Sequence, residues 1–197
     1  MALPASTSAA DLVTFAGTGT AGFGGDGGPA GAAALNGARG MSLTSTGAIL
    51  IADTTNNRIR RIAADGTITT VAGTGTAAST GDGATATLAT LNAPRDVAVT
   101  SDGGYLIADT GGNKIRKVSS GGTITTVAGT GTASSTGDGG PAALATLNGP
   151  SSVDPTPDGG YLIADTTGSR IRKVAPTSNT ITTVAGTGTA SSTGDGG

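Results

Sequence analysis

The sequence predicts an all-β fold of repeated four-stranded antiparallel sheets, and three observations predict it. First, one block recurs with a period of about 56 residues, as ILIADTTNNRIRRI from residue 49, YLIADTGGNKIRKV from residue 105 and YLIADTTGSRIRKV from residue 161. Second, each period holds four short runs rich in Val, Ile and Thr, separated by Gly, Asp and Asn. Third, the chain has 36 glycines and no Glu, so strong helix formers are scarce.

The second repeat shows the expected strands most clearly. They cover residues 95–101, 105–110, 114–118 and 123–129, and the turns SDGG, GGN and SSGG join them. Turns this short connect neighbouring strands as antiparallel hairpins. A connection of about twenty residues then leads to the next unit, and its PAALATL segment at 141–147 predicts a short helical turn. Such units in tandem predict the blades of a β-propeller, with a β-solenoid as the alternative.

The repeat also predicts the domain organisation. Residues 1–11 form a tail, and residues 12–197 form propeller repeats in which 187–197 begin a further connection. LVTFAG at 12–17 matches only the last strand of a blade, which predicts an extra N-terminal outer strand. In the third repeat, Asp154 and Pro155 interrupt the apolar alternation of the first strand, which indicates a weakened inner strand. The three complete blades are expected at about 40–73, 95–129 and 151–186.

The glycine-rich connections contain a spacing typical of dinucleotide-binding loops, Gly17-x-Gly19-x-x-Gly22. The third glycine becomes Ala78 and Ser134 in the next two repeats, and no long helix follows any copy. A dinucleotide loop requires both features. We therefore expect the glycines to serve tight turns with positive φ.

The composition excludes several classes of function. The chain has no Cys and no His, which excludes disulfides, thiolate metal sites and imidazole chemistry. A net charge of −2 and 2% aromatic residues argue against a nucleic-acid partner. No apolar run approaches the roughly 20 residues of a membrane span, so no membrane partner is expected.

The order VAGTGTAGFGGDGGPA, LNGARG, ILIADTTNNRIRRI and GTITTVAG resembles the NHL-repeat family, in its variety with long loops. The motifs IAD, Arg/Lys-Ile-Arg and TVAG follow in this order three times, and the match runs from Leu12 onward. The resemblance implies a β-propeller, often of six blades, in a family of protein- and RNA-binding modules, sensors and a few lyases. It also implies an extracellular or cell-surface protein. Catalytic members use metal-binding His residues, which this chain lacks.

The repeat places Asp and Arg residues at constant positions. The Asp after each Ile-Ala is expected to cap a turn or to pair with a nearby Arg, although a ring of these carboxylates for Ca²⁺ is the alternative. The Asp of each Gly-Asp-Gly is expected to stabilise its turn, again with Ca²⁺ binding as the alternative. The basic strands predict interblade partners for these Asp residues and a solvated rim, with a polyanion-binding stripe as the alternative. The repeated positions are Asp53, Asp109, Asp165, Arg60, Arg116, Arg172, Asp26, Asp82, Asp138 and Asp195.

Three blades are expected to leave an apolar sheet face open at each end. The sequence therefore predicts a structural or interaction module that is not an enzyme, has no cofactor or metal, and binds copies of itself and possibly other proteins. Two chains would close a six-bladed ring, or many would form a filament. One alternative is a Ca²⁺-dependent hydrolase or lyase that uses Asp96 and Asp154, and another is a propeller that binds glycans or peptides.

Overall fold

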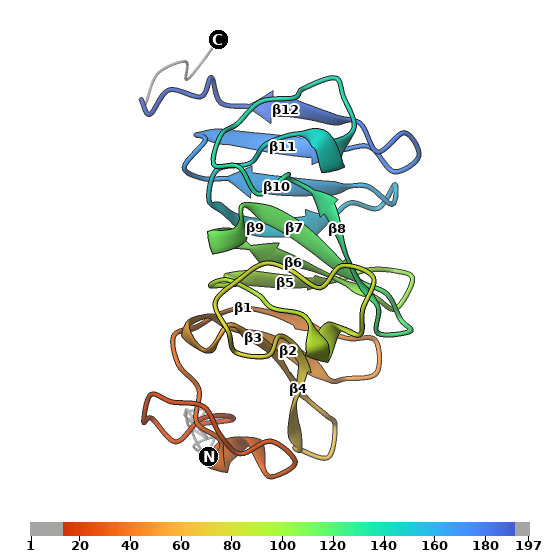
Figure 1. Ribbon diagram of the computed structural model, residues 1–197. Coiled ribbons are helices and arrows are strands. Elements are labelled where there is room, and N and C mark those ends of the chain that lie inside the picture. The colour runs from red at the N-terminus through yellow and green to blue at the C-terminus, as the bar shows by residue number, and fades with distance from the viewer. Residues whose placement is uncertain (1–13, 192–197) are drawn as a thin grey trace, which may run out of the picture.

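The computed structural model describes residues 14–191 and contains three four-stranded antiparallel sheets. In each sheet the strands lie in chain order. Figure 1 shows the three sheets stacked one beyond the next, with the connection before β1 at one end of the stack and β12 at the other. The all-β fold of propeller blades that the repeats predict is confirmed.

The strands follow the expected pattern of three short hairpins in each blade. Blade 1 contains β1 (Ala38–Leu43), β2 (Ile49–Asp53), β3 (Arg58–Ile62) and β4 (Ile68–Ala72). Blade 2 contains β5 (Asp96–Val99), β6 (Tyr105–Asp109), β7 (Lys114–Val118) and β8 (Ile124–Ala128). Blade 3 contains β9 (Pro150–Pro155), β10 (Tyr161–Asp165), β11 (Arg170–Val174) and β12 (Ile181–Ala185).

Short 3-10 turns interrupt the β structure at two repeated places. In each connection a single turn follows an extended residue, as η1 (Ala30–Ala32), η3 (Ala86–Leu88) and η5 (Ala142–Leu144). Between the second and third strands, η2 (Thr54–Asn56) and η4 (Thr110–Gly112) end at Asn57 and Asn113, both in the left-handed conformation. Asn tolerates this conformation better than most residues, which explains its use at these corners.

The core lies between neighbouring blades. One cluster joins β2 and β3 of blade 1 to β5, β6 and β8 of blade 2 through Ala86, Ala89 and Leu91 of the connection. The equivalent cluster joins blades 2 and 3 through Ala142, Ala145 and Leu147. Each connection therefore fills the space between the blade before it and the blade after it. Small Ala side chains suit this place because backbone and sheet approach closely there.

The first strands of the blades face one another. β1 contacts β5, and β5 contacts β9, so the innermost strands line the centre of the array. The expectation of a weakened inner strand in the third repeat is wrong, because β9 spans six residues, as β1 does. Pro155 stands at the last position of β9, opposite Tyr161, where its missing N–H does not break the interior of the ladder.

The extra N-terminal strand expected at 12–17 is not formed by Thr14–Gly17, and residues 12 and 13 lie outside the described residues. Within residues 14–191, no strand pairs with this segment. It still follows the repeat in its contacts. Ala16 packs against the cluster on the outer face of blade 1, and the Gly17 N–H donates to the Ala30 carbonyl.

Candidate functional site

A fully buried Arg on the third strand of each blade binds two Asp residues. In blade 1, Arg60 lies between Asp53, the last residue of β2, and Asp26 of the connection, at 3.3 Å and 2.7 Å. The Arg60 and Asp53 side chains are both 0% exposed. Because a buried charge is costly unless it is paired and hydrogen-bonded, the network couples the connection firmly to its blade.

The same network recurs in the other two blades. Arg116 reaches Asp82 at 2.7 Å and Asp109 at 3.5 Å. Arg172 reaches Asp138 at 2.7 Å and Asp165 at 3.5 Å. The structure thus brings together nine of the ten repeat positions that the sequence singles out, and Asp195 lies outside the described residues.

The surroundings shift the pKa values of the two network carboxyl groups of blade 2 in opposite directions. Burial raises the pKa of Asp109, against hydrogen bonds from Ser79 and the Asn92 N–H and the charge of Arg116. Burial also acts to raise the pKa of the more exposed Asp82, but its hydrogen bonds and the Arg116 charge outweigh burial and lower that pKa. Burial therefore outweighs the partners of the inner carboxylate of blade 2, whereas the partners of the outer carboxylate outweigh burial.

Sequence reasoning did not find the hydroxyl groups that complete the network. Ser79 and Ser135 of the connections donate to Asp109 and Asp165. The N–H groups of Asn92 and Asn148 donate to the other oxygens of the same two carboxylates. Their constant phase in the repeat is a signal that could have marked them.

The two Asp residues of the alternative hydrolase or lyase site have different surroundings. Asp96 accepts hydrogen bonds from the Ser152 hydroxyl and the Val153 N–H on the next inner strand, whereas Asp154 is exposed.

Across residues 14–191, no group of three or more His, Cys, Asp or Glu side chains could hold a metal ion. In the same range, no helix has the length and hydropathy needed to cross a membrane.

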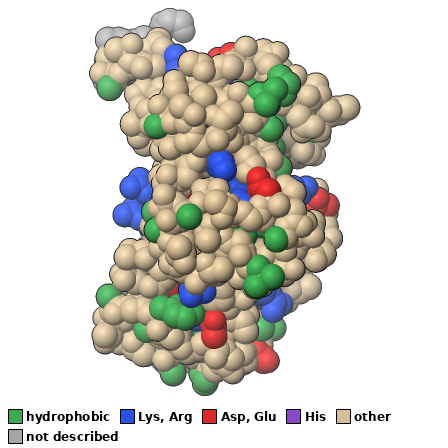
Figure 2. All heavy atoms as spheres, viewed as in Figure 1, with side chains coloured by type: hydrophobic (Ala, Val, Ile, Leu, Met, Phe, Trp, Pro, Cys, Tyr) green, Lys and Arg blue, Asp and Glu red, His purple; other side chains and the backbone are tan. Residues whose placement is uncertain are grey.

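The basic residues of the third strands have two kinds of partner, according to their position in the strand. Arg58, Lys114 and Arg170 donate to backbone carbonyls of the connections. Lys117 and Lys173 form exposed ion pairs with Asp102 and Asp158 in the turn between the first two strands. Figure 2 shows the charged side chains in small groups on a mostly neutral face, without a continuous basic stripe in this view.

The two ends of the array expose side chains whose repeat equivalents are buried. At the N-terminal face, Met41 of β1 is 67% exposed, whereas Val97 and Val153 at the same position are 1% and 2% exposed. At the C-terminal face, Ile171 of β11 is 38% exposed, whereas Ile59 and Ile115 are 0% exposed. Leu43 and Val184 extend these two faces. We call them the N-terminal face (Met41, Leu43) and the C-terminal face (Ile171, Val184).

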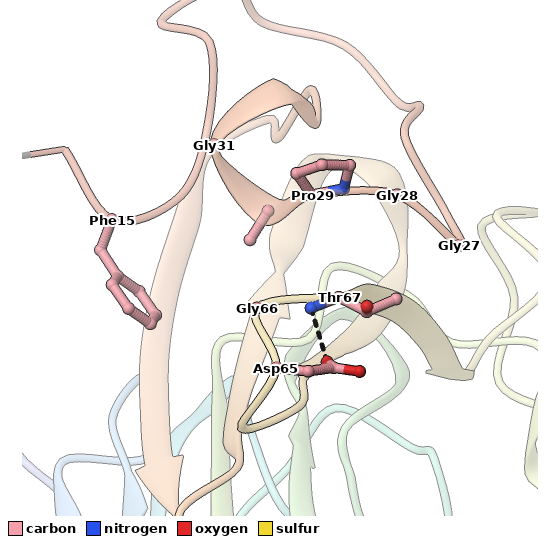
Figure 3. A pocket seen from close by; sticks show the side chains of 9 residues that line it. Phe15, Gly27, Gly28, Pro29, Gly31, Asp65, Gly66 and Thr67 are labelled. Atoms are coloured by element: carbon pink, nitrogen blue, oxygen red, sulfur yellow. Dashed lines mark hydrogen bonds between the residues drawn. The ribbon is translucent and has the colours of Figure 1, made fainter.

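A hollow of about 320 Å³ lies beside the N-terminal connection. Figure 3 shows Phe15 on one side of it, and the loop from Gly27 to Gly31 and the β3–β4 turn around the rest. Among the described residues that line it, Asp65 is the only charged one, and its carboxylate accepts a hydrogen bond of 2.9 Å from the Thr67 N–H. Four of the nine described lining residues are glycines, and Asp65 and Thr67 provide the polar side chains.

Comparisons with known proteins agree with this geometry. The family model "Teneurin NHL domain" matches residues 74–137, less than half of the chain. No curated protein sequence matches the chain. Among solved structures, a streptogramin B lyase is similar with a TM-score of 0.52 and 20% identity over 75% of this chain and 40% of that one.

Two further solved structures share the fold. A gluconolactonase from Xanthomonas campestris has a TM-score of 0.53 and 12% identity over 76% of this chain and 47% of its own. An auxiliary nutrient binding protein from Bacteroides ovatus has a TM-score of 0.57 and 17% identity over 78% of this chain and 37% of its own. The chain therefore spans less than half the length of each of these structures.

These similarities contradict the expectation that the chain is not an enzyme, and they support the expected propeller fold. The prediction that the chain is not an enzyme is wrong as an inference from its repeats, because a lyase and a lactonase are among the proteins that share its fold. The matched segment contains the connection between blades 1 and 2, the whole of blade 2 and the start of the next connection, and the same motifs continue through blade 3. Residues 74–137 match an NHL domain model, and the chain has the fold of β-propeller blades that these solved structures share.

Proposed function

We propose that the chain is a self-associating interaction module whose N-terminal face binds the C-terminal face of a second copy. The observation that carries this proposal is the exposure of Met41 and Ile171, because the residues at their repeat positions are buried at both internal interfaces. Removing such apolar surface from water favours association. The contact between the two copies is expected to resemble the interfaces between neighbouring blades of one chain.

A second copy is the occupant that the repeat favours. In both internal interfaces, a face equivalent to the C-terminal face packs against a connection and an inner strand equivalent to the N-terminal face. One chain carries both halves of this contact, so two copies offer each other complementary surfaces. The contact is head-to-tail, which gives a ring when the rotation closes and a filament when it does not. Two three-bladed chains make six blades, within the usual range for closed propellers.

In such a contact, two segments would occupy the same place on blade 1. Gly17 donates to the Ala30 carbonyl, as Gly73 donates to Ala86 and Gly129 to Ala142. In a head-to-tail contact, Gly186 of one copy reaches the same carbonyl of the other. Residues 14–17 of one copy and the end of β12 of the other therefore compete for one place. Removing residues 1–17 is expected to strengthen association.

The test combines two face variants. Sedimentation velocity of the full chain is expected to show association, and M41D or I171D, each damaging one face, is expected to give monomers. An equimolar mixture of M41D and I171D is expected to restore pairs, because M41D keeps its C-terminal face and I171D keeps its N-terminal face. L144D is the matched control, since Leu144 is 74% exposed but lies on the connection.

The outcomes separate the alternatives. Pairs that form only in the mixture support a head-to-tail contact. Loss of association in one variant alone, with the other unaffected, indicates a contact between identical faces. A monomeric full chain up to millimolar concentration overturns the proposal.

A further inference from the structure

Two equivalent grooves lie between the blades, beside the turns that follow the inner strands. The groove between blades 2 and 3 has a volume of about 210 Å³, and its lining includes Asp102, Lys117 and Tyr161. The groove between blades 1 and 2 has a volume of about 560 Å³, and its lining includes Thr46, Arg61 and Tyr105 at the same repeat positions. The two grooves differ most in their charged residues.

Blades 2 and 3 have an ion pair between the third strand and the turn after the first strand, and blade 1 lacks it. Lys117 binds Asp102 at 2.5 Å, and Lys173 binds Asp158 at 3.0 Å. Arg61 occupies the same strand position, but Thr46 stands where those Asp residues stand, and its hydroxyl group pairs with that of Thr44 at 3.0 Å. Within residues 14–191, the Arg61 side chain has no ion pair and no side-chain hydrogen bond.

Asp65 interacts electrostatically with Arg61 but does not form the missing ion pair. A hydrogen bond from the Thr67 N–H is the largest of the effects that lower the pKa of Asp65, and the charge of Arg61 is a smaller one. The Asp65 carboxylate is fully exposed and turned toward its own turn. Of the described residues that line the larger groove, only Arg61 carries a charge. The groove therefore combines one unpaired cation with a neutral wall.

The rest of this wall suits a small polar ligand. The Ser45 and Ser101 hydroxyls line the groove and make no hydrogen bond in the described part of the chain. Leu50, Val99 and Tyr105 form its apolar side. A guanidinium group presents a planar fork of donors that matches carboxylate and phosphate oxygens. Pockets of a few hundred Å³ that combine apolar walls with a few polar groups are typical of small-molecule sites.

We propose that the groove between blades 1 and 2 binds the carboxylate or phosphate group of a small hydroxylated molecule, with Arg61 as its anchor. Thr46 makes this possible because it leaves Arg61 unpaired, whereas Asp at this position neutralises the basic residue in blades 2 and 3. The site lies within one chain and does not depend on association with a second copy.

Titration calorimetry of the full chain with three matched sugars tests the proposal. Glucuronate carries a carboxylate, glucose 6-phosphate carries a phosphate, and glucose carries neither. At least one anionic sugar is expected to bind while glucose does not, and the pair of results identifies which oxyanion is preferred. R61Q is expected to weaken binding by about tenfold or more, since a charge-assisted pair is lost.

T46D is the sharper variant because it rebuilds an ion pair that the fold already accommodates twice. It is expected to weaken binding as much as R61Q, with unfolding stability unchanged or raised. K173Q, at the same strand position in blade 3, is the matched control and is expected to bind as the unaltered chain does. Equal binding of glucose, no binding of either anion at millimolar concentration, or unchanged binding in both R61Q and T46D overturns the proposal.

Discussion

Asn56 donates a hydrogen bond of 2.8 Å from its side-chain amide to Asp53, and it thereby does in blade 1 what a connection serine does in the other blades. In blade 2, the Ser79 hydroxyl donates to Asp109, and Gly112 stands at the position of Asn56. Phe23 occupies the repeat position of Ser79, with its ring centroid 3.9 Å from the Arg58 guanidinium carbon. In blade 1 the side-chain donor to the Asp is therefore Asn56 at the corner, and the ring of Phe23 occupies the place that Ser79 has in blade 2.

The exchange predicts strong coupling between residues 79 and 112. A side chain at Gly112 would collide with Ser79, so G112N alone is expected to destabilise the fold by about 1–3 kcal/mol. S79F alone removes a hydrogen bond to a buried carboxylate and is expected to cost a similar amount. The double variant S79F/G112N reproduces the arrangement of blade 1 and is expected to recover most of the loss. Urea unfolding of the four proteins measures the coupling, and additive losses would contradict it.

Two neighbouring residues of β7 separate a buried ion pair from an exposed one. R116M leaves Asp109 buried without its cation, and breaking a buried pair in this way costs about 3–5 kcal/mol. K117M removes an exposed pair with Asp102 and is expected to cost about 1 kcal/mol or less. Thermal unfolding of both variants provides the measurement. Equal losses would show that the inner network does not stabilise the blade.

Ser169 marks a difference between the C-terminal face and the internal interfaces. Asn57 and Asn113 accept hydrogen bonds from the N–H groups of Ala93 and Gly149 in the next connection, at 2.8 Å and 2.9 Å. Ser169 holds the same corner with a φ of 52°, but its side chain is shorter. In the proposed head-to-tail contact, the corresponding N–H belongs to Gly37 of the second copy.

S169N is therefore expected to tighten association about fivefold, the equivalent of one hydrogen bond of about 1 kcal/mol. Sedimentation equilibrium measures the change, and S169A serves as the control. A gain in monomer stability without any change in association would contradict the expected role of this corner.

The exposed ion pairs predict a dependence of stability on pH. Hydrogen bonds from the Thr156 hydroxyl and from Lys173 lower the pKa of Asp158 far below its ordinary value. Because the folded pKa is lower than the unfolded one, near 4, this stabilisation is present above about pH 4 and is lost as the pH falls below it. D158N is expected to be less stable than the unaltered chain at pH 6, and the difference in stability is expected to be smaller at pH 2. Denaturant unfolding at both pH values checks this, and a difference that is independent of pH would contradict it.

Much of the fold could be predicted because its signals are local. Alternating β-branched residues form the strands, and Gly, Asp and Asn form the turns, within a few residues of one another. The repeat then multiplies each signal three times. The same locality explains the wrong expectations, since Thr14–Gly17 has the sequence of a strand but pairs with no strand among residues 14–191, and Pro155 falls at the end of β9.

The sequence by itself determined the period, the four strands of each blade and the repeated Asp and Arg positions. Only the tertiary structure decided that each Arg bridges two carboxylates, because Arg60 meets Asp26 from 34 positions away. It also decided that Arg61 lines an open groove without a partner, and that Met41 and Ile171 are exposed while their equivalents are buried. Strand and turn preferences act between near neighbours in the chain, whereas burial and ion pairing depend on which segments meet when one blade stacks on the next.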